Sequence, residues 1–124
     1  MTDLEIVNGA QMTCARQKYT FPSHYSGDTF AGTVFTIRLN DAPLDLTGAS
    51  IDFTFIHETN NSYTYSLTSD DEITITNDTG GVFQIDRQVI NWYPGLYNYD
   101  MTITTNDSGV YTWIYGTWSI LNAN

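Results

Sequence analysis

The chain has 124 residues, the usual size of one domain, which argues against two independently stable domains. Fourteen acidic residues against four basic ones give a formal net charge of −10, a field that repels phosphate backbones and anionic lipid headgroups, so neither nucleic acid nor a membrane surface is an expected partner. Hydrophobic residues make up 41% of the chain and aromatic residues 15%, which excludes a disordered chain and suits a β-sheet core.

Residues 1–15 show no sustained hydrophobic period, so we predict an N-terminal arm followed by one domain over residues 16–124. The arm either frays, as chain ends commonly do, or docks on a neighbouring molecule through Leu4, Ile6 and Val7. Cys14 is the single cysteine, so no internal disulfide forms, and an idle thiol is a better interpretation than a nucleophile.

From residue 16 onward, apolar and polar residues alternate between turn-forming residues, which predicts antiparallel strands and no helices. The first predicted strand runs from Arg16 to Phe21 and is ended by Pro22. The second, Phe30 to Leu39, has these core candidates: Val34, Phe35, Ile37 and Leu39. Ser50 to His57 places alternate residues on one face, and Tyr63 to Leu67 is expected to pair with it as a hairpin.

The second half of the sequence continues the same pattern. The predicted strands are Glu72 to Thr76, Val82 to Asp86, Leu96 to Thr105 and Val110 to Leu121. In the third of these, four core candidates share one side: Tyr97, Tyr99, Met101 and Ile103. Strands of this number and spacing predict a sandwich of two antiparallel sheets.

The last predicted strand has two apolar faces. One consists of Ile114, Trp118 and Ile120, and the other of Tyr111, Trp113 and Tyr115. If the first face enters the core, the second presents three aromatic rings for protein contacts or for stacking on sugars. The competing interpretation is that a sheet, a loop or the arm covers these rings.

Motifs for catalysis or cofactor binding are missing from the sequence, so we expect neither enzymatic activity nor a cofactor. His24 and His57 lack the short spacing to a second His or Cys that a zinc site needs. The hydrolase elbow and the glycine-rich phosphate and dinucleotide loops do not occur. Counting acids alone does not exclude a carboxylate pair in the fold.

The acidic and asparagine-rich loops favour plain explanations. Asp70 to Glu72 and Asn77-Asp78 offer oxygen ligands but lack the spacing of a calcium loop, so we expect solvated loops and no metal site. The acidic charge as a whole also serves solubility. The sequence shows no secretory signal and no run of 18 apolar residues, so we expect a complete, soluble, cytosolically made chain whose sequons at Asn60, Asn77 and Asn106 are turns.

Three blocks of sequence resemble the immunoglobulin-like domains of tailed-phage structural proteins, particularly the N-terminal domain of baseplate upper proteins and related tail-fibre or head-attached modules. The first block contains Gly27 and Asp28, and the second runs from Ala42 to Ile51 with Leu46, Thr47 and Gly48 at its centre. The third block and the following strand contain these residues: Gly95, Tyr97, Tyr99, Asp100 and Gly116. The resemblance implies an all-β, immunoglobulin-like antiparallel sandwich of about seven to nine strands. All of these residues are of architectural types, such as turn glycines and core tyrosines.

The resemblance also implies a non-enzymatic virion component, made in the host cytoplasm, that binds other virion proteins and forms a homo-oligomer or part of a larger assembly. Proteins of the baseplate-upper type continue into fibrous regions, whereas this sequence stops after its last predicted strand. We therefore expect a tail or baseplate adaptor, a capsid decoration protein or the anchor of a separate fibre. The alternative from another class is a carbohydrate-binding module that stacks sugars on Tyr111, Trp113 and Tyr115.

Overall fold

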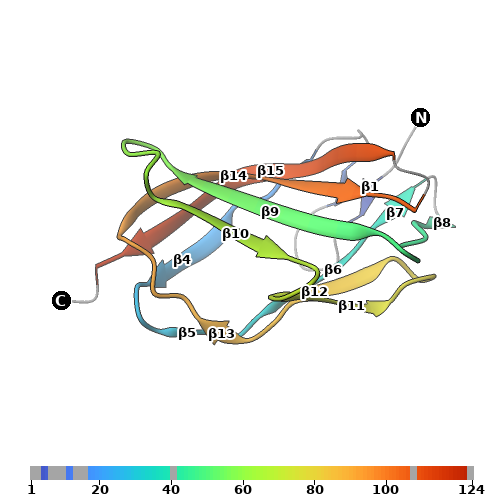
Figure 1. Ribbon diagram of the computed structural model, residues 1–124, viewed down its shortest axis with the longest axis horizontal. Helices are drawn as coiled ribbons and strands as arrows, with labels where there is room; N and C mark the ends of the chain where they lie inside the picture. Colours follow the sequence, from blue (N-terminus) through green and yellow to red (C-terminus); the bar gives the residue numbers. More distant parts are fainter. Residues whose placement is uncertain (1–3, 6–10, 13–16, 40–41, 107–108, 123–124) are drawn as a thin grey trace.

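A computed structural model describes residues 4–5, 11–12, 17–39, 42–106 and 109–122, with side chains described for 18–38, 42–106, 109–110 and 114–122. These residues form strands, turns and loops and contain no helix. Two sheets pack face to face, with the long strands β9, β14 and β15 crossing the upper part of Figure 1 and β6, β12 and β11 lying below them. The chain is therefore an all-β sandwich, as predicted.

The larger sheet has the strand order β10-β9-β14-β15-β3, with β4 also paired to β15. Its long strands are β9 (Ser50–His57), β14 (Gly95–Thr104) and β15 (Val110–Leu121), and β10 (Thr64–Thr68) forms a hairpin with β9, as predicted. Neighbours are antiparallel except for β3 (Gln17–Lys18) and β4 (Phe21–Tyr25), which run parallel to β15.

The smaller sheet has the order β11-β12-β6, formed by β11 (Ile73–Asn77), β12 (Val82–Ile85) and β6 (Thr33–Thr36). Three two-residue ladders complete the described strands. They pair β13 (Gln88–Val89) with β5 (Thr29–Phe30), β7 (Arg38–Leu39) with β8 (Ala42–Pro43), and β1 (Leu4–Glu5) with β2 (Gln11–Met12). The last ladder lies within the predicted arm.

The strand order is that of an immunoglobulin-like domain. The run β10-β9-β14-β15 corresponds to strands C′, C, F and G of the variable type, and β11-β12-β6 corresponds to D, E and B. At the start of β14, the hydroxyl of Tyr97 donates a hydrogen bond of 2.6 Å to the carbonyl of Tyr93, which is the tyrosine corner of this fold. The described residues form 15 strands, more than the predicted seven to nine, because seven of them have only two residues; the other eight have four or more.

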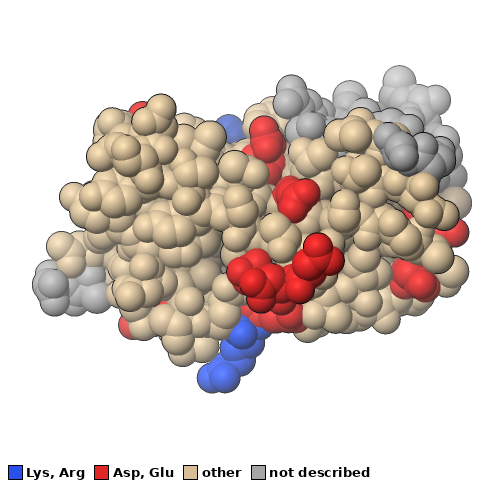
Figure 2. Space-filling model, viewed as in Figure 1, with Lys and Arg blue, Asp and Glu red and all other residues tan. Residues whose placement is uncertain are grey.

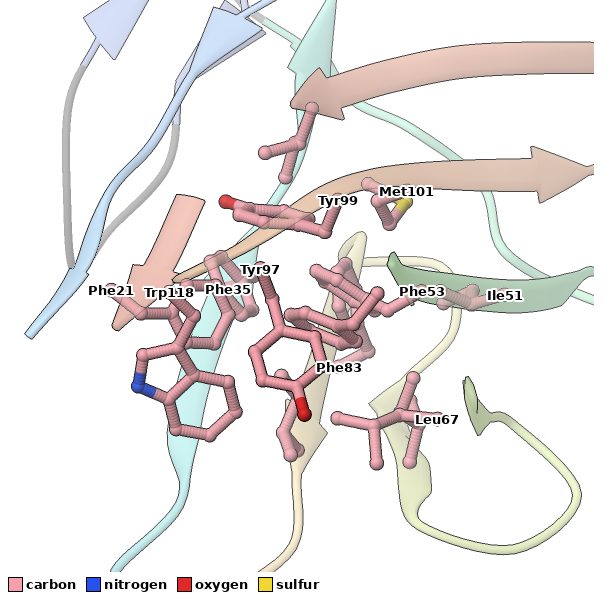
Figure 3. Packing of buried hydrophobic residues seen from close by; sticks show 14 of the residues in the cluster. Phe21, Phe35, Ile51, Phe53, Leu67, Phe83, Tyr97, Tyr99, Met101 and Trp118 are labelled. Carbon is pink, nitrogen blue, oxygen red and sulfur yellow. The ribbon is translucent and has the colours of Figure 1, made fainter. Parts of the chain in front are cut away.

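The core follows the predicted alternation. The inward residues of β14, namely Tyr97, Tyr99, Met101 and Ile103, are buried, as are Ile114, Trp118 and Ile120 on β15. Figure 3 shows the rings of the larger sheet packed against Phe35 and Phe83 of the smaller one, whose ring centroids lie 5.2 Å apart. Aromatic packing of this kind joins the two sheets without a disulfide.

Two details of the predicted strands are wrong. Pro22 does not end the first strand but lies inside β4, where its carbonyl accepts a hydrogen bond from the Trp118 indole; an outermost strand tolerates proline because no further strand needs its N–H. The predicted strand Phe30 to Leu39 is broken into three pieces, with Gly32 at a φ of +99° in the first break.

Val34 is not a core residue, although the sequence predicts it as one. It lies opposite Gln84 on the outer side of β6 and is 38% exposed, whereas Phe35 and Ile37 are fully buried. The side chain of Leu39 lies outside the described residues. Only half of the residues in a strand with one solvated face can enter the core, and here Phe35 sets the register.

The corner between β8 and β9 is built as its residue types indicate. Leu46 is fully buried, and its N–H donates to the carbonyl of Asp78. Gly48 has a φ of +71°, which L-residues rarely adopt. The carboxylate of Asp45 accepts hydrogen bonds from the Thr47 hydroxyl and N–H, which lowers the pKa of Asp45 below its ordinary value.

The two buried tyrosines of β14 predict a loss of stability at alkaline pH. Burial raises the pKa of both Tyr97 and Tyr99 far above the ordinary value of 10.0, so the unfolded chain loses these protons first. These two tyrosines should therefore add no pH dependence to the free energy of unfolding well below pH 10, and should make it fall as the pH rises above 10. Urea unfolding followed by circular dichroism at a series of pH values measures this.

Tyr97→Phe should reduce the steepness of that fall, because it removes one of the tyrosines whose pKa is raised by burial. Tyr25→Phe is the matched control, since it removes a hydroxyl from a residue that is 51% exposed, and it should leave the steepness unchanged. Equal steepness in the Tyr97→Phe variant and the unmodified chain would contradict the assignment.

Candidate interaction surfaces

One end of the sandwich is built from stacked aromatic rings. The rings of Tyr63 and Tyr93 lie parallel within 1°, with centroids 4.1 Å apart. Next to them, Tyr65 and Trp92 are parallel within 3° at 4.6 Å. Both pairs join the beginning of β10 to the segment that precedes β14. We call this region the aromatic end and define it by Tyr63, Tyr65, Trp92 and Tyr93.

Hydrogen bonds hold the aromatic end in place. The N–H of Thr59 donates to Nδ1 of His57, so the ring proton is on Nε2, which donates to the carbonyl of Pro94 at 3.1 Å. Gly95 has a φ of +146°, and a Cβ at this position would overlap the His57 ring. The Tyr93 N–H donates to the Tyr65 hydroxyl at 3.3 Å. Both sides of the stack are therefore fixed.

Exposed apolar side chains surround the aromatic end. Tyr93 is 51% exposed, as is Tyr25, and Leu96 at the start of β14 is 37% exposed. Tyr25 of β4 lies opposite Leu121 of β15. Leu121 follows Ile120, which pairs with Gly95 at the start of β14, so Tyr25 lies at the same end of the sheet as the aromatic end. Figure 2 shows few charged side chains over the left end of this face, where β14 begins in Figure 1, whereas acidic residues gather near its middle.

A second feature is a hollow of about 790 Å³ on the outer face of the larger sheet. Its sheet side is formed by two adjacent strands, where Thr54 and Ile56 of β9 lie opposite Asp100 and Asn98 of β14. Its other side is the β9–β10 hairpin loop, drawn at the upper left of Figure 1, which contributes residues 58–61. His57 and Tyr99, which are both buried, complete the lining.

The structure places part of the predicted aromatic face. Tyr115 is 42% exposed and lies opposite Asp100, so it is on the same side of the sheet as the hollow. Tyr111 and Trp113 belong to β15, but their side chains lie outside the described residues. The register shifts between Ile114 and Thr112, which leaves Trp113 without an opposite residue. A shared face for the three rings therefore stays a prediction.

The predicted docking residues of the arm are not placed. Leu4 is in β1, but its side chain lies outside the described residues, and so do Ile6 and Val7 entirely. Cys14 also falls outside them.

Most of the residues that carry the family resemblance support the fold. Gly27 has a φ of +93°, in a turn where its N–H and the carbonyl of Asp28 both bond to the backbone of Ile90. In the corner, the Thr47 hydroxyl donates a hydrogen bond to the Asp45 carboxylate. Tyr99 donates a hydrogen bond of 2.5 Å to the Tyr19 carbonyl, alongside Gly116. Asp100 differs from the others because it is exposed at the hollow.

Sequence reasoning did not identify the aromatic end or the hollow. The break in alternation at residues 91–93 was a signal for the former, because an Asn-Trp-Tyr-Pro run between two strands has to bury or stack its rings. The hollow had no such signal, because the sequence around Asn98 shows only that its side chain faces outward on an alternating strand.

Few side chains suited to catalysis or metal binding lie close together in the described residues. Among the described residues, no three His, Cys, Asp or Glu side chains come together as a metal site. The Asn77-Asp78 turn uses its own side chains, since Asn77 Oδ1 accepts from the Gly80 N–H and Asp78 Oδ1 from the Thr79 N–H. The described part of the chain also has no helix that is long and apolar enough to cross a membrane.

Comparisons with known proteins concern the fold. No family model and no curated protein sequence matches the chain. Among solved structures, the chain is similar to a family 123 glycoside hydrolase from Clostridium perfringens, studied for glycolipid glycan hydrolysis, with a TM-score of 0.50 and 16% identity. That match covers 85% of this chain and 23% of the hydrolase, so the chain spans about a quarter of that enzyme. CopC from Methylosinus trichosporium OB3b matches with a TM-score of 0.47 and 8% identity over 100% of this chain and 97% of CopC.

Proposed function

We propose that this chain is a structural protein of a tailed-phage virion, an adaptor or decoration module that acts through protein contacts and not through catalysis. The aromatic end is the observation that carries the proposal. Its partner is another virion protein or a second copy of this chain. The sequence blocks that resemble phage immunoglobulin-like domains supply the virion context.

The aromatic end has the composition of an interface core. Interface cores are depleted in charged residues and enriched in tyrosine and tryptophan. At this end Tyr93 and the neighbouring Tyr25 are exposed, Tyr63 and Tyr65 are half-buried, and Trp92 is buried and supports them from the core. The chain carries a net charge of −10, yet few charged side chains appear over this end in Figure 2. Since the rings are already stacked and hydrogen-bonded, little side-chain entropy would be lost on binding.

The sugar-stacking alternative receives less support as first formulated. It requires Tyr111, Trp113 and Tyr115 to form one platform, and only Tyr115 has a described side chain. The likeness to the glycoside hydrolase is one of fold, so it does not favour a sugar-directed function.

The proposal predicts that the chain is incorporated into phage particles through its aromatic end. A tagged copy expressed during phage production should co-purify with particles in a density gradient and be detected there by mass spectrometry. Tyr25→Asp combined with Leu96→Asp places charge at this end and should lower incorporation by about tenfold or more, because a desolvated unpaired charge weakens a contact strongly.

Val110→Asp is the matched control. Val110 is 64% exposed at the start of β15, the opposite end of the strand from Leu121, so the same change there should leave incorporation unchanged. A chain that stays in the soluble fraction, or a double variant incorporated as well as the control, would contradict the proposal.

A further inference from the structure

We infer that the hollow on the outer face of the larger sheet is a binding site for a neutral oligosaccharide. The inference concerns residues 54–61 and 98–100 and is independent of the virion contact at the aromatic end. It also differs from a platform formed by Tyr111, Trp113 and Tyr115, because the recognition comes mainly from polar groups.

The polar groups of the hollow are available to a ligand. Within the described parts of the chain, no hydrogen bond or ion pair engages the side chains of Asn61, Asn98 or Asp100. An amide offers two donors and an acceptor, and a carboxylate offers acceptors only. Asn98 and Asp100 project on the same side of β14, about 7 Å apart along the strand, a spacing comparable to one sugar ring.

The hollow is preformed. The Glu58 N–H donates to the carbonyl of Leu96, which ties the beginning of the hairpin loop to β14. Within the loop, the Asn60 carboxamide oxygen accepts from the Ser62 N–H at 3.0 Å. At its end, Tyr63 is stacked on Tyr93. A site held in this way loses little conformational entropy when a ligand binds.

The lining selects the class of ligand. It includes the carboxylates of Glu58 and Asp100 and no Lys or Arg, so phosphates and acidic sugars are repelled. Most lining side chains are polar, which does not suit an apolar ligand. A neutral saccharide fits both conditions, because its hydroxyls donate and accept.

Two apolar contacts suit the C–H faces of sugar rings. Ile56 forms part of the lining and is 42% exposed. Tyr115 lies beside Asp100 on the neighbouring strand and presents an exposed ring to a saccharide that extends beyond the hollow. A chain of several sugar units would therefore be bound better than one unit.

The experiment is a titration of the isotope-labelled protein, followed by amide NMR, with hexasaccharides of glucose, mannose, galactose and N-acetylglucosamine. At least one of them should shift the resonances of Asn61, Asn98 and Asp100 in a saturable manner, whereas an oligogalacturonate should not. Asn98→Ala and Asp100→Ala should each weaken that binding by about tenfold or more, because each removes a hydrogen-bonding group that faces the sugar.

Asp52→Ala is the matched control for Asp100→Ala. It removes a carboxylate from the same face of the sheet but outside the hollow, and it should leave the affinity unchanged. All three side chains are exposed, so each variant should melt as the unmodified chain does. Absence of saturable shifts with all four hexasaccharides, or binding that survives both substitutions in the hollow, would overturn the inference.

Discussion

Trp118→Ala should lower the free energy of unfolding by about 4 kcal/mol, in the range measured for large aromatic side chains removed from protein cores. The indole is fully buried on β15 and contacts rings from separate parts of the chain. Its ring centroid lies 4.8 Å from that of Phe21, 5.1 Å from that of Phe30 and 5.3 Å from that of Trp92. The substitution therefore opens a cavity where the first strands meet the aromatic end.

A lost hydrogen bond adds to the cavity. Nε1 of Trp118 donates to the carbonyl of Pro22 at 2.9 Å, so truncation leaves that carbonyl without this partner. Trp118→Phe separates the two effects, because it keeps most of the ring contacts and removes the donor, and it should cost less than Trp118→Ala. Urea unfolding followed by far-UV circular dichroism measures both variants.

Tyr25→Ala is the control for this series. It removes an aromatic side chain from a residue that is 51% exposed, so its effect should remain within about 0.5 kcal/mol. A Trp118→Ala variant destabilised by no more than Tyr25→Ala would show that the indole is not a core residue.

Long alternating strands were the predictable part of this fold. The predicted Ser50 to His57 and Val110 to Leu121 coincide with β9 and β15, and Leu96 to Thr105 is shifted from β14 by one residue at each end. In these strands one face is buried against the other sheet, so a slip of one residue would expose the entire apolar set. The hydrophobic pattern then determines which residues face the core.

The first strands were less predictable because their pairing is not local. β3 and β4 run parallel to β15, the last described strand. The sequence near Pro22 contains no local pattern that indicates pairing with β15. Likewise, the break at Gly32 occurs where the chain leaves the β5–β13 ladder and joins β12. Such changes of partner depend on the assembled sheets and not on neighbouring residues.

The exposed surfaces also divide into a part that the sequence predicts and a part that it does not. The sequence predicts that Tyr115 points away from the core, because alternation requires this once Ile114 and Trp118 are buried, but it leaves open whether another segment covers the ring. The hollow depends instead on the register between β9 and β14, which brings Thr54 opposite Asp100, and on the course of a hairpin loop. Neither is encoded in a short segment.

Gly116 lies so close to the carbonyl of Tyr19 that no side chain fits at this position. A Cβ at this position would overlap the carbonyl oxygen of Tyr19 and come within 3.2 Å of the Tyr99 ring. The Tyr19 carbonyl has little room to move, because it accepts the Tyr99 hydroxyl and the Tyr19 N–H donates to the carbonyl of Tyr115 at 2.9 Å. The glycine thus permits the link between β3 and β4 to lie flat against β15.

Gly116→Ala should lower the free energy of unfolding by about 3 kcal/mol, because the methyl group forces that link away from the sheet and overpacks the core beside Tyr99. The amide of Tyr19 should also exchange with solvent faster in this variant, since its hydrogen bond to Tyr115 is strained. Gly27→Ala is the control: Gly27 has a positive φ but open space around its Cα, so only the backbone penalty of about 1 kcal/mol applies. If the two variants are equally stable and Tyr19 exchange is unchanged, steric contact with the first strands is not what requires glycine at position 116.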